Sequence, residues 1–434
     1  MILCVHKTLL LEYLLFIGYL LLFVWMVTKI KFFTGSGFTK SQVIIIFLLK
    51  VMAGILYGWV GIYYGETAMM VDTWVYHYSG LKEYKLLYTN PPEYFTNLFS
   101  NPFEGGYLKF LSGHDSFWNE LKAKSIVKLI SVFDIFSFGN YYTNIIFYSF
   151  ITLFGPFCIY RVMKDVFPGK TVQVTIATFF IPSFIYWTSG IHKEGLIFTG
   201  ICFIVYNFYF ALKKGKFSVK RIVYILLGLF VLTILRNFLL VIIIPALIAW
   251  FIVAKFHKNP LKIFLFTYLF FAVIFFLAKY ISPGFDFPAI VVSKQREFLD
   301  MYGGSMVPVE ELNPSTWGFI RAIPQALSLS TLRPYPGDIQ HILSLAAAIE
   351  IDFILLLFVV FVFFRTPTSI NNKGFIYFCL FFSFTTLLSI GYTVNFIGAI
   401  VRYRSIFLPF LVTPIVALID WDKIRRLVLA PTIK

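Results

Sequence analysis

Residues 42–63 read QVIIIFLLKVMAGILYGWVGIY, an apolar run that contains a single charged residue, Lys50. A helix rises 1.5 Å per residue, so about 20 residues cross the roughly 30 Å hydrocarbon core of a bilayer. This run is therefore long enough to span a membrane as one helix. Lys50 lies about two turns from its start and is expected either to extend to the membrane surface or to join a buried ion pair.

The rest of the chain repeats this apolar pattern. It predicts an all-α fold, a polytopic transmembrane helix bundle of about eleven spans in which residues 1–434 form a single transmembrane domain. The composition agrees, because 59% hydrophobic and only 13% charged residues do not describe a water-soluble chain. The predicted spans are 9–28, 42–63, 141–160, 171–187, 195–212, 221–235, 238–254, 262–280, 343–364, 375–391 and 403–419.

The formal net charge of +16 would suggest a nucleic-acid partner in a soluble protein. Here the basic residues follow the predicted topology, because alternate connections carry 20 Lys and Arg against three acids. By the positive-inside rule these connections are cytoplasmic, which predicts an outer N-terminus and a cytoplasmic C-terminus. The charge is therefore an orientation signal, and no nucleic-acid partner is expected.

Cysteine and histidine show no site signature. The four cysteines are far apart and mostly lie inside apolar runs, which predicts packing roles instead of disulfides. His77, His192 and His341 do not have the spacing of metal ligands. The sequence therefore indicates neither a metal nor another cofactor.

Two connections on the predicted outer side are long, 64–140 and 281–342, and both are too apolar and aromatic to be disordered. In the first, basic and apolar residues alternate at helical spacing over 122–133. This predicts an amphipathic helix that lies on the outer leaflet or packs against the bundle. The second contains two candidate short helices, 287–301 and 315–332.

Residues that chemistry could use gather at five places on the predicted outer side. They are Asp72, Tyr76 and His77; His192, Lys193 and Glu194; Arg236; Arg333, Asp338 and His341; and Arg402 and Arg404. The predicted topology brings these places to one membrane surface, where cations would hold an anionic head group and a carboxylate would serve as base. Each residue also has a simpler interpretation, since Arg and Lys anchor span ends and Asp72 can cap a helix.

Two further carboxylates, Glu350 and Asp352, lie inside a predicted span. A charged side chain at the centre of a span costs about 2.5–3.5 kcal/mol on insertion scales. We therefore expect a partner for them, such as Arg402 or Arg333.

Four short motifs on the outer side are similar to patterns of a known group. They are an acid early in the first long loop, Asp72 in DTWVYHY; the turn WTSGIHKE at 187–194; RPYP at 333–336; and RYR at 402–404. Together with the order of the outer elements, they resemble the GT-C superfamily of polytopic glycosyltransferases and the related bacterial cell-surface polysaccharide polymerases. The acid here follows the second predicted span and is a single Asp72.

The resemblance implies an integral glycosyltransferase of the bacterial inner membrane that uses a polyprenyl-phosphate-linked sugar on the periplasmic face. It implies that Asp72 deprotonates a glycan or lipid acceptor, that His77 or Tyr76 orients this acceptor, and that the cations stabilise the leaving phosphate. Membrane lipid, donor and acceptor are then the expected partners. An O-antigen-type polysaccharide polymerase is an alternative. A flippase or transporter of lipid-linked oligosaccharides and a structural subunit of an envelope complex are alternatives of another class.

Overall fold

The computed structural model describes residues 2–63, 72–101, 103, 110–111, 116–366 and 372–429. Within these ranges the protein is all-helical, as predicted, and its extended pairing consists of two isolated antiparallel bridges, Met306 to Phe396 and Arg365 to Ile419. The contacts divide the chain into two compact units. Unit 1 comprises Met1–Arg161, Ile185–Phe208 and Phe217–Asn237, and unit 2 comprises Val162–Phe184, Tyr209–Lys216 and Phe238–Lys434.

Unit 1 contains the N-terminal helices and the first long loop. Its complete helices are α1 (Ile2–Lys29), α2 (Lys31–Thr34), α3 (Lys40–Tyr63), α4 (Asp72–Thr89), α5 (Pro91–Thr96), the 3-10 turn η2 (Asn97–Phe99), α6 (Phe117–Ser137) and α11 (Val219–Leu235). Three helices begin in one unit and end in the other, namely α7 (Tyr141–Val166), α9 (Pro182–Ser189) and α10 (Lys193–Lys213).

Unit 2 contains α8 and the C-terminal half of the chain. Its helices are α8 (Thr171–Phe179), α12 (Phe238–Phe256), α13 (Pro260–Leu277), α14 (Phe287–Leu299), α15 (Thr316–Leu327), α16 (Ile342–Phe363), α17 (Lys373–Thr393), α18 (Ile397–Ser405), α19 (Leu408–Leu418) and α20 (Trp421–Leu429). Short helical turns are η3 (Ala278–Tyr280), η4 (Pro283–Phe285), the π-helical η5 (Ser328–Leu332) and η6 (Pro336–Asp338).

Eight helical segments in the described part of the chain are long and apolar enough to cross a membrane, a pattern typical of a multi-pass membrane protein. They are Leu11–Lys29 of α1, α3, α7, α10, α12, Pro260–Tyr280, α16 and α17. The pair α18 and α19, bent by 63° at its break, makes a ninth if it counts as one span.

Of the other three predicted spans, two are broken near a proline and the third is one continuous but shorter helix. Residues 171–187 form two short helices, α8 and α9, since Pro182 starts the second one. The span at 221–235 corresponds to α11, which has 17 residues. The span at 403–419 falls on α18 and α19, and Pro409 lies in the first turn of α19. An apolar run therefore predicts where helical structure lies better than it predicts one continuous helix.

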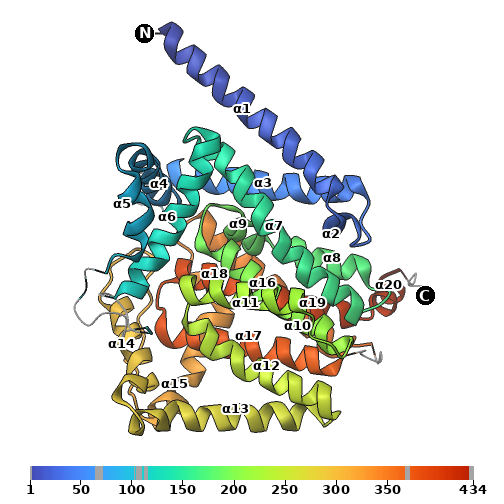
Figure 1. Ribbon diagram of the computed structural model, residues 1–434. Helices are drawn as coiled ribbons and strands as arrows, with labels where there is room; N and C mark the ends of the chain where they lie inside the picture. The colour runs from blue at the N-terminus through green and yellow to red at the C-terminus, as the bar shows by residue number, and fades with distance from the viewer. Residues whose placement is uncertain are drawn as a thin grey trace. The chain divides into compact units, whose positions relative to one another are not determined.

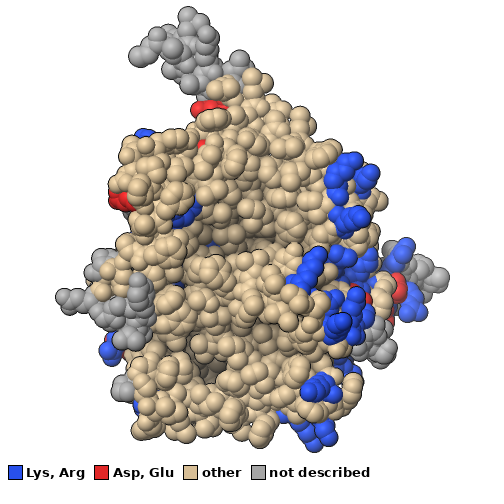
Figure 2. All heavy atoms as spheres, in the orientation of Figure 1, with Lys and Arg blue, Asp and Glu red and all other residues tan. Residues whose placement is uncertain are grey.

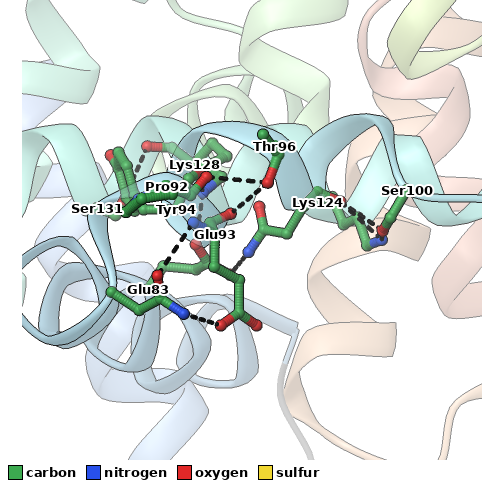
Figure 3. A network of polar contacts seen from close by, with 11 residues as sticks. Glu83, Pro92, Glu93, Tyr94, Thr96, Ser100, Lys124, Lys128 and Ser131 are labelled. Atoms are coloured by element: carbon green, nitrogen blue, oxygen red, sulfur yellow. Dashed lines mark hydrogen bonds and ion pairs between the residues drawn. The ribbon is translucent and has the colours of Figure 1, made fainter.

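The first long loop folds within unit 1, where α6 packs on α4 and α5 lies beside them (Figure 1). The helix predicted over 122–133 is part of α6, and its Ile126 and Ile130 are buried. Lys128 Nζ lies 2.6 Å from Glu83 of α4 and 3.6 Å from the ring centroid of Tyr94 of α5 (Figure 3). These contacts favour a helix packed on its neighbours, the second of the two forms that the sequence allows.

Asp134 of α6 is a buried carboxyl group whose Oδ1 accepts a hydrogen bond from Asn144 Nδ2 at 2.7 Å. Burial raises the pKa of Asp134 to about 6, an effect that the hydrogen bond opposes. The folded state therefore binds the proton more tightly than the unfolded chain does. Because the unfolded pKa is about 3.9, this contribution to stability is greatest below about pH 4 and is lost as the pH rises through 6.

We expect Asp134→Asn to remove this pH dependence and to raise stability at about pH 8 by about 1–2 kcal/mol, since an amide carries no charge to desolvate. The thermal unfolding midpoint in detergent, measured from about pH 4 to about pH 8, tests this. Glu120→Gln on the same helix should keep the wild-type profile. A profile of Asp134→Asn parallel to the wild type would contradict the assignment.

In unit 2, α12, α13 and α17 lie side by side (Figure 1). Trp250 of α12 is fully buried, with its ring 5.4 Å from that of Phe375 and 5.0 Å from that of Phe378 on α17. Figure 2 shows Lys and Arg gathered at the end of this unit that carries the α12–α13 connection and α20. These basic residues belong to the set from which a cytoplasmic side is predicted.

The second long loop also contains helices. Both short helices that the sequence predicts are present, as α14 and as α15 followed by η5. Val292, Leu312 and Phe319 form a buried cluster against which Tyr392 of α17 packs. The loop is therefore packed on a candidate span of its own unit.

Helices α15 and α17 approach each other most closely at Gly391, where an added Cβ would lie 1.9 Å from the Ala326 carbonyl oxygen. Gly391→Ala is expected to lower stability by about 1–3 kcal/mol, because the clash is with backbone that has to shift. Thermal unfolding of the variant in detergent measures the loss. Gly18→Ala, which meets no atom within 4 Å, is the matched control. Equal midpoints for the two variants would contradict this packing.

Candidate functional site

Three of the predicted site residues lie at the turn between α9 and α10 in unit 1. α9 ends at Ser189, α10 begins at Lys193, and His192 is the last residue of the turn. The path is tight, because a Cβ on Gly190 would lie 2.1 Å from the ring of the buried Tyr57. Only glycine fits this position without displacing the ring, so the sequence WTSGIHKE places its charged residues at the start of a helix.

His192 lies between two carboxylates. Its Nε2 is 2.9 Å from Asp72 Oδ2, and its Nδ1 contacts Glu194 Oε2. The His192 side chain is 1% exposed, and its backbone carbonyl accepts a hydrogen bond from the Tyr148 hydroxyl. Each ring nitrogen of His192 therefore faces a carboxylate oxygen, the kind of acceptor to which an imidazole N–H donates.

Glu194 is the buried centre of this group. Its side chain is 0% exposed, and its second oxygen, Oε1, lies 3.0 Å from Arg236 Nη2. Arg236 follows α11 and is also buried. Glu194 lies in the first turn of α10, where the helix dipole favours a negative charge. The carboxylate therefore contacts both His192 and the Arg236 guanidinium group, and its loss would remove a buried negative charge beside this cation.

Asp72 is the exposed end of the group. It begins α4, and its side chain is 47% exposed. Tyr76 follows one turn later, and its ring packs against that of His192 with centroids 5.9 Å apart, while Lys193 Nζ lies 5.7 Å from its centroid. Burial raises the pKa of Tyr76 more than Lys193 lowers it, so the hydroxyl stays protonated at neutral pH. Asp72 and Tyr76 therefore meet the 190–194 turn from the same face of α4.

His77, the second predicted catalytic residue, points to a different face of α4. It is buried, with its ring 5.6 Å from that of Trp74 and 5.4 Å from that of Tyr141. Burial lowers the pKa of His77 to about 4, so the ring is neutral at pH 7. In this structure His77 is part of an aromatic cluster, and His192 has the place beside Asp72 that the sequence analysis gave to His77.

The remaining predicted residues lie in unit 2. Arg404 is 1% exposed, and its Nη1 donates to the Arg333 carbonyl oxygen at 2.5 Å. Arg333 Nη1 in turn lies 2.7 Å from Asp338 Oδ1. Arg333 also lines an open pocket of about 430 Å³, whose other lining residues are Pro308, Val309, Glu310, Gln325, Ser328 and Leu329.

Two predicted residues of this unit make local contacts. Arg402 Nη2 donates to the Tyr403 hydroxyl at 3.3 Å. His341 caps α16, because its Nδ1 accepts the backbone N–H of Ser344 at 3.1 Å. His341 therefore acts as an ordinary N-terminal helix cap.

The buried Glu350 of α16 has a partner, as the sequence predicts, but a different one. Its Oε2 accepts the backbone N–H of Ser183 at 2.6 Å, and its charge acts on Arg404. These two groups take the place expected for Arg402 or Arg333. Asp352, by contrast, is exposed. The partner of Glu350 differs from the predicted one because the helix N-terminus at Ser183 supplies backbone donors that sequence spacing does not reveal.

Two further residues contact the segment around His192: Tyr148, which the sequence does not indicate, and Lys50, for which it predicts either an extension to the membrane surface or a buried ion pair. Tyr148 contacts the carbonyl of His192, and Lys50 Nζ donates to the Thr188 carbonyl oxygen at 2.8 Å. Tyr148 gives no sequence signal, because it is one of many aromatic residues in apolar runs. Lys50 does, because it is the single charge in its run and a charge in a span demands a partner.

The structure therefore gathers Asp72, Tyr76, His192, Lys193, Glu194 and Arg236 in unit 1, and Arg333, Asp338 and Arg404 in unit 2. Among the described residues, no group of three or more His, Cys, Asp or Glu side chains could hold a metal ion. Comparison with protein family models, with curated proteins and with solved structures finds no match for this chain. Its function has to be inferred from these two groups.

Proposed function

We propose that the protein is an integral membrane glycosyltransferase that moves a sugar from a polyprenyl-phosphate-linked donor to a glycan or lipid acceptor. In this proposal it acts on the periplasmic face of the bacterial inner membrane, during assembly of a cell-surface polysaccharide or glycolipid. The observation that supports it best is the continuous group from exposed Asp72 through His192 and Glu194 to Arg236. A half-exposed carboxylate supported by buried charges is suited to proton transfer at a surface.

Asp72 is the base in this proposal. Its carboxylate, which is 47% exposed, accepts the proton of an acceptor hydroxyl, while the oxygen of that hydroxyl bonds to the sugar carbon and the bond to the phosphate oxygen breaks. His192 donates a hydrogen bond to Asp72 and fixes the orientation of the carboxylate. Buried Glu194 contacts the other ring nitrogen of His192, and Arg236 holds Glu194 in place.

Lys193 is the cation of unit 1 that is proposed to meet the leaving phosphate. It starts α10 and lies over Tyr76, so it is carried by the same turn as His192. A fixed cation stabilises negative charge that grows on a leaving group. Within unit 2, taken by itself, Arg333 and Arg402 are proposed to bind an anionic group, and Arg404 and Asp338 fix the position of Arg333.

The direct experiment is to incubate the purified protein, reconstituted in vesicles, with a polyprenyl-phosphate-linked sugar and a glycan or lipid acceptor, and to separate the products by chromatography and mass spectrometry. One added sugar per acceptor supports transfer, and a ladder of repeats supports the polymerase form of the same chemistry. Movement of the lipid between leaflets without a new glycosidic bond would favour a flippase. Neither product nor movement would leave the proposal without support.

A further inference from the structure

Lys50 is a charged residue buried in the candidate span α3, and its contacts explain why it is there. The residue is 4% exposed. An ammonium group has three donors, and three oxygens surround this one: the Thr188 carbonyl at 2.8 Å, the Ser189 hydroxyl at 3.4 Å and the Thr188 hydroxyl at 3.5 Å. A charge at this depth is costly unless it is fully solvated by the protein, so this constellation has a role that offsets the cost.

All three oxygens lie at the C-terminal end of α9, the helix that precedes the His192 turn. The last carbonyl groups of a helix have no intrahelical partners and carry the negative end of the helix dipole. A lysine ammonium group satisfies both requirements at once. Lys50 therefore acts as a C-terminal cap that comes from a distant helix, 138 residues away in sequence from Thr188.

The same face of α3 also contacts the next two residues along the chain, Ser189 and Gly190. A Cβ on Gly54 would lie 2.7 Å from the Ser189 carbonyl oxygen, so the two backbones touch there. One turn later Tyr57 packs on Gly190. Residues 50, 54 and 57 follow one another at helical spacing, so α3 presents a continuous surface to the end of α9.

This surface ends two residues before His192. Residues 188–190 lead directly into the turn, and a shift there would displace His192 and Glu194 from Asp72. We propose that Lys50 is a positioning residue that fixes the 188–194 segment through the carbonyl end of α9. The positioning of this segment follows from the contacts alone, whereas its effect on catalysis rests on the function proposed above.

The test compares Lys50→Met, which keeps the side-chain stem and removes the charge, with Lys50→Arg, which keeps charge and donors. Hydrogen–deuterium exchange of the full-length protein in detergent gives a readout that needs no activity. In Lys50→Met we expect exchange of the amides of residues 188–194 to quicken by about tenfold or more, with α4 and α6 unchanged. Lys50→Arg should restore most of the protection, and Lys40→Met, an exposed control on the same helix, should behave as wild type.

In the transfer assay, kcat of Lys50→Met should fall by about 10- to 100-fold, because His192 and Lys193 shift with the segment that carries them while Asp72 stays on α4. If wild type catalyses no transfer, the proposed function fails, and exchange alone decides on Lys50. If the amides of folded Lys50→Met exchange at wild-type rates, the inference is overturned. A uniform rise in exchange rate across unit 1 also overturns it, because it would show a general loss of stability. If Lys50→Met does not fold, Lys50→Gln, an uncharged donor, is measured in the same way.

Discussion

Glu194→Gln is expected to lower the stability of the folded protein by about 3–5 kcal/mol, the typical cost of breaking a buried ion pair from one side. Glu194 is fully buried and contacts both His192 and Arg236. A glutamine of the same size has one side-chain oxygen, which can accept from only one of the two groups that Glu194 contacts. Its NH2 group, a donor, then faces the other group. The substitution therefore removes the buried negative charge beside the Arg236 guanidinium group.

Thermal and denaturant unfolding of purified Glu194→Gln in detergent measure this effect. Glu93→Gln, on exposed α5, is the control and should unfold as wild type does. Adding Arg236→Met to Glu194→Gln should recover part of the loss, because it removes the orphaned guanidinium group. Wild-type stability of Glu194→Gln would contradict the assignment of Glu194 as the centre of the group.

Asp72→Asn is expected to reduce the transfer rate by about 10²–10⁴-fold, the usual contribution of a general base. The protein should remain folded, because the side chain is 47% exposed and its loss removes one hydrogen bond to His192 and a favourable charge at the start of α4. A charge at a helix N-terminus contributes about 0.3–1 kcal/mol, so the unfolding midpoint should fall only slightly.

Steady-state transfer kinetics of Asp72→Asn, with donor KM measured separately, test this expectation. A loss in kcat with an unchanged KM indicates that the residue acts in the transition state. Glu93→Gln again serves as the control, since it removes a carboxylate from the same loop. Undiminished product from Asp72→Asn would remove this residue as the base.

The sequence predicts the helices well where one uninterrupted apolar run covers the whole helix. The runs at 42–63 and 343–364 correspond to α3 and α16 because an uninterrupted apolar run of that length has few other ways to satisfy its backbone in a membrane. The same rule predicts one span at 171–187, but the segment forms two helices because Pro182 starts a new one. It also missed the 63° bend after Ser405, because a bend depends on packing that a linear pattern does not contain.

The sequence indicates candidate site residues one by one, but it does not indicate which of them contact each other. Asp72 and His192 are 120 residues apart, and no spacing rule connects them. His77 was preferred for its nearness in sequence to Asp72, although a separation of five residues turns it to another face of the helix. Lys50 could have been assigned, because a single charge in a span requires a partner, but its partners are backbone and hydroxyl oxygens that have no sequence signature.

The central claim is that Asp72 and His192 act as one unit, and a double-mutant cycle on the transfer rate tests it most directly. Asp72→Asn and His192→Gln are measured singly and together under identical conditions, after thermal unfolding has shown that all three variants are folded. If the two residues act together, the double variant transfers sugar no more slowly than the slower single variant. Losses that multiply would show that the residues act independently and would contradict the account.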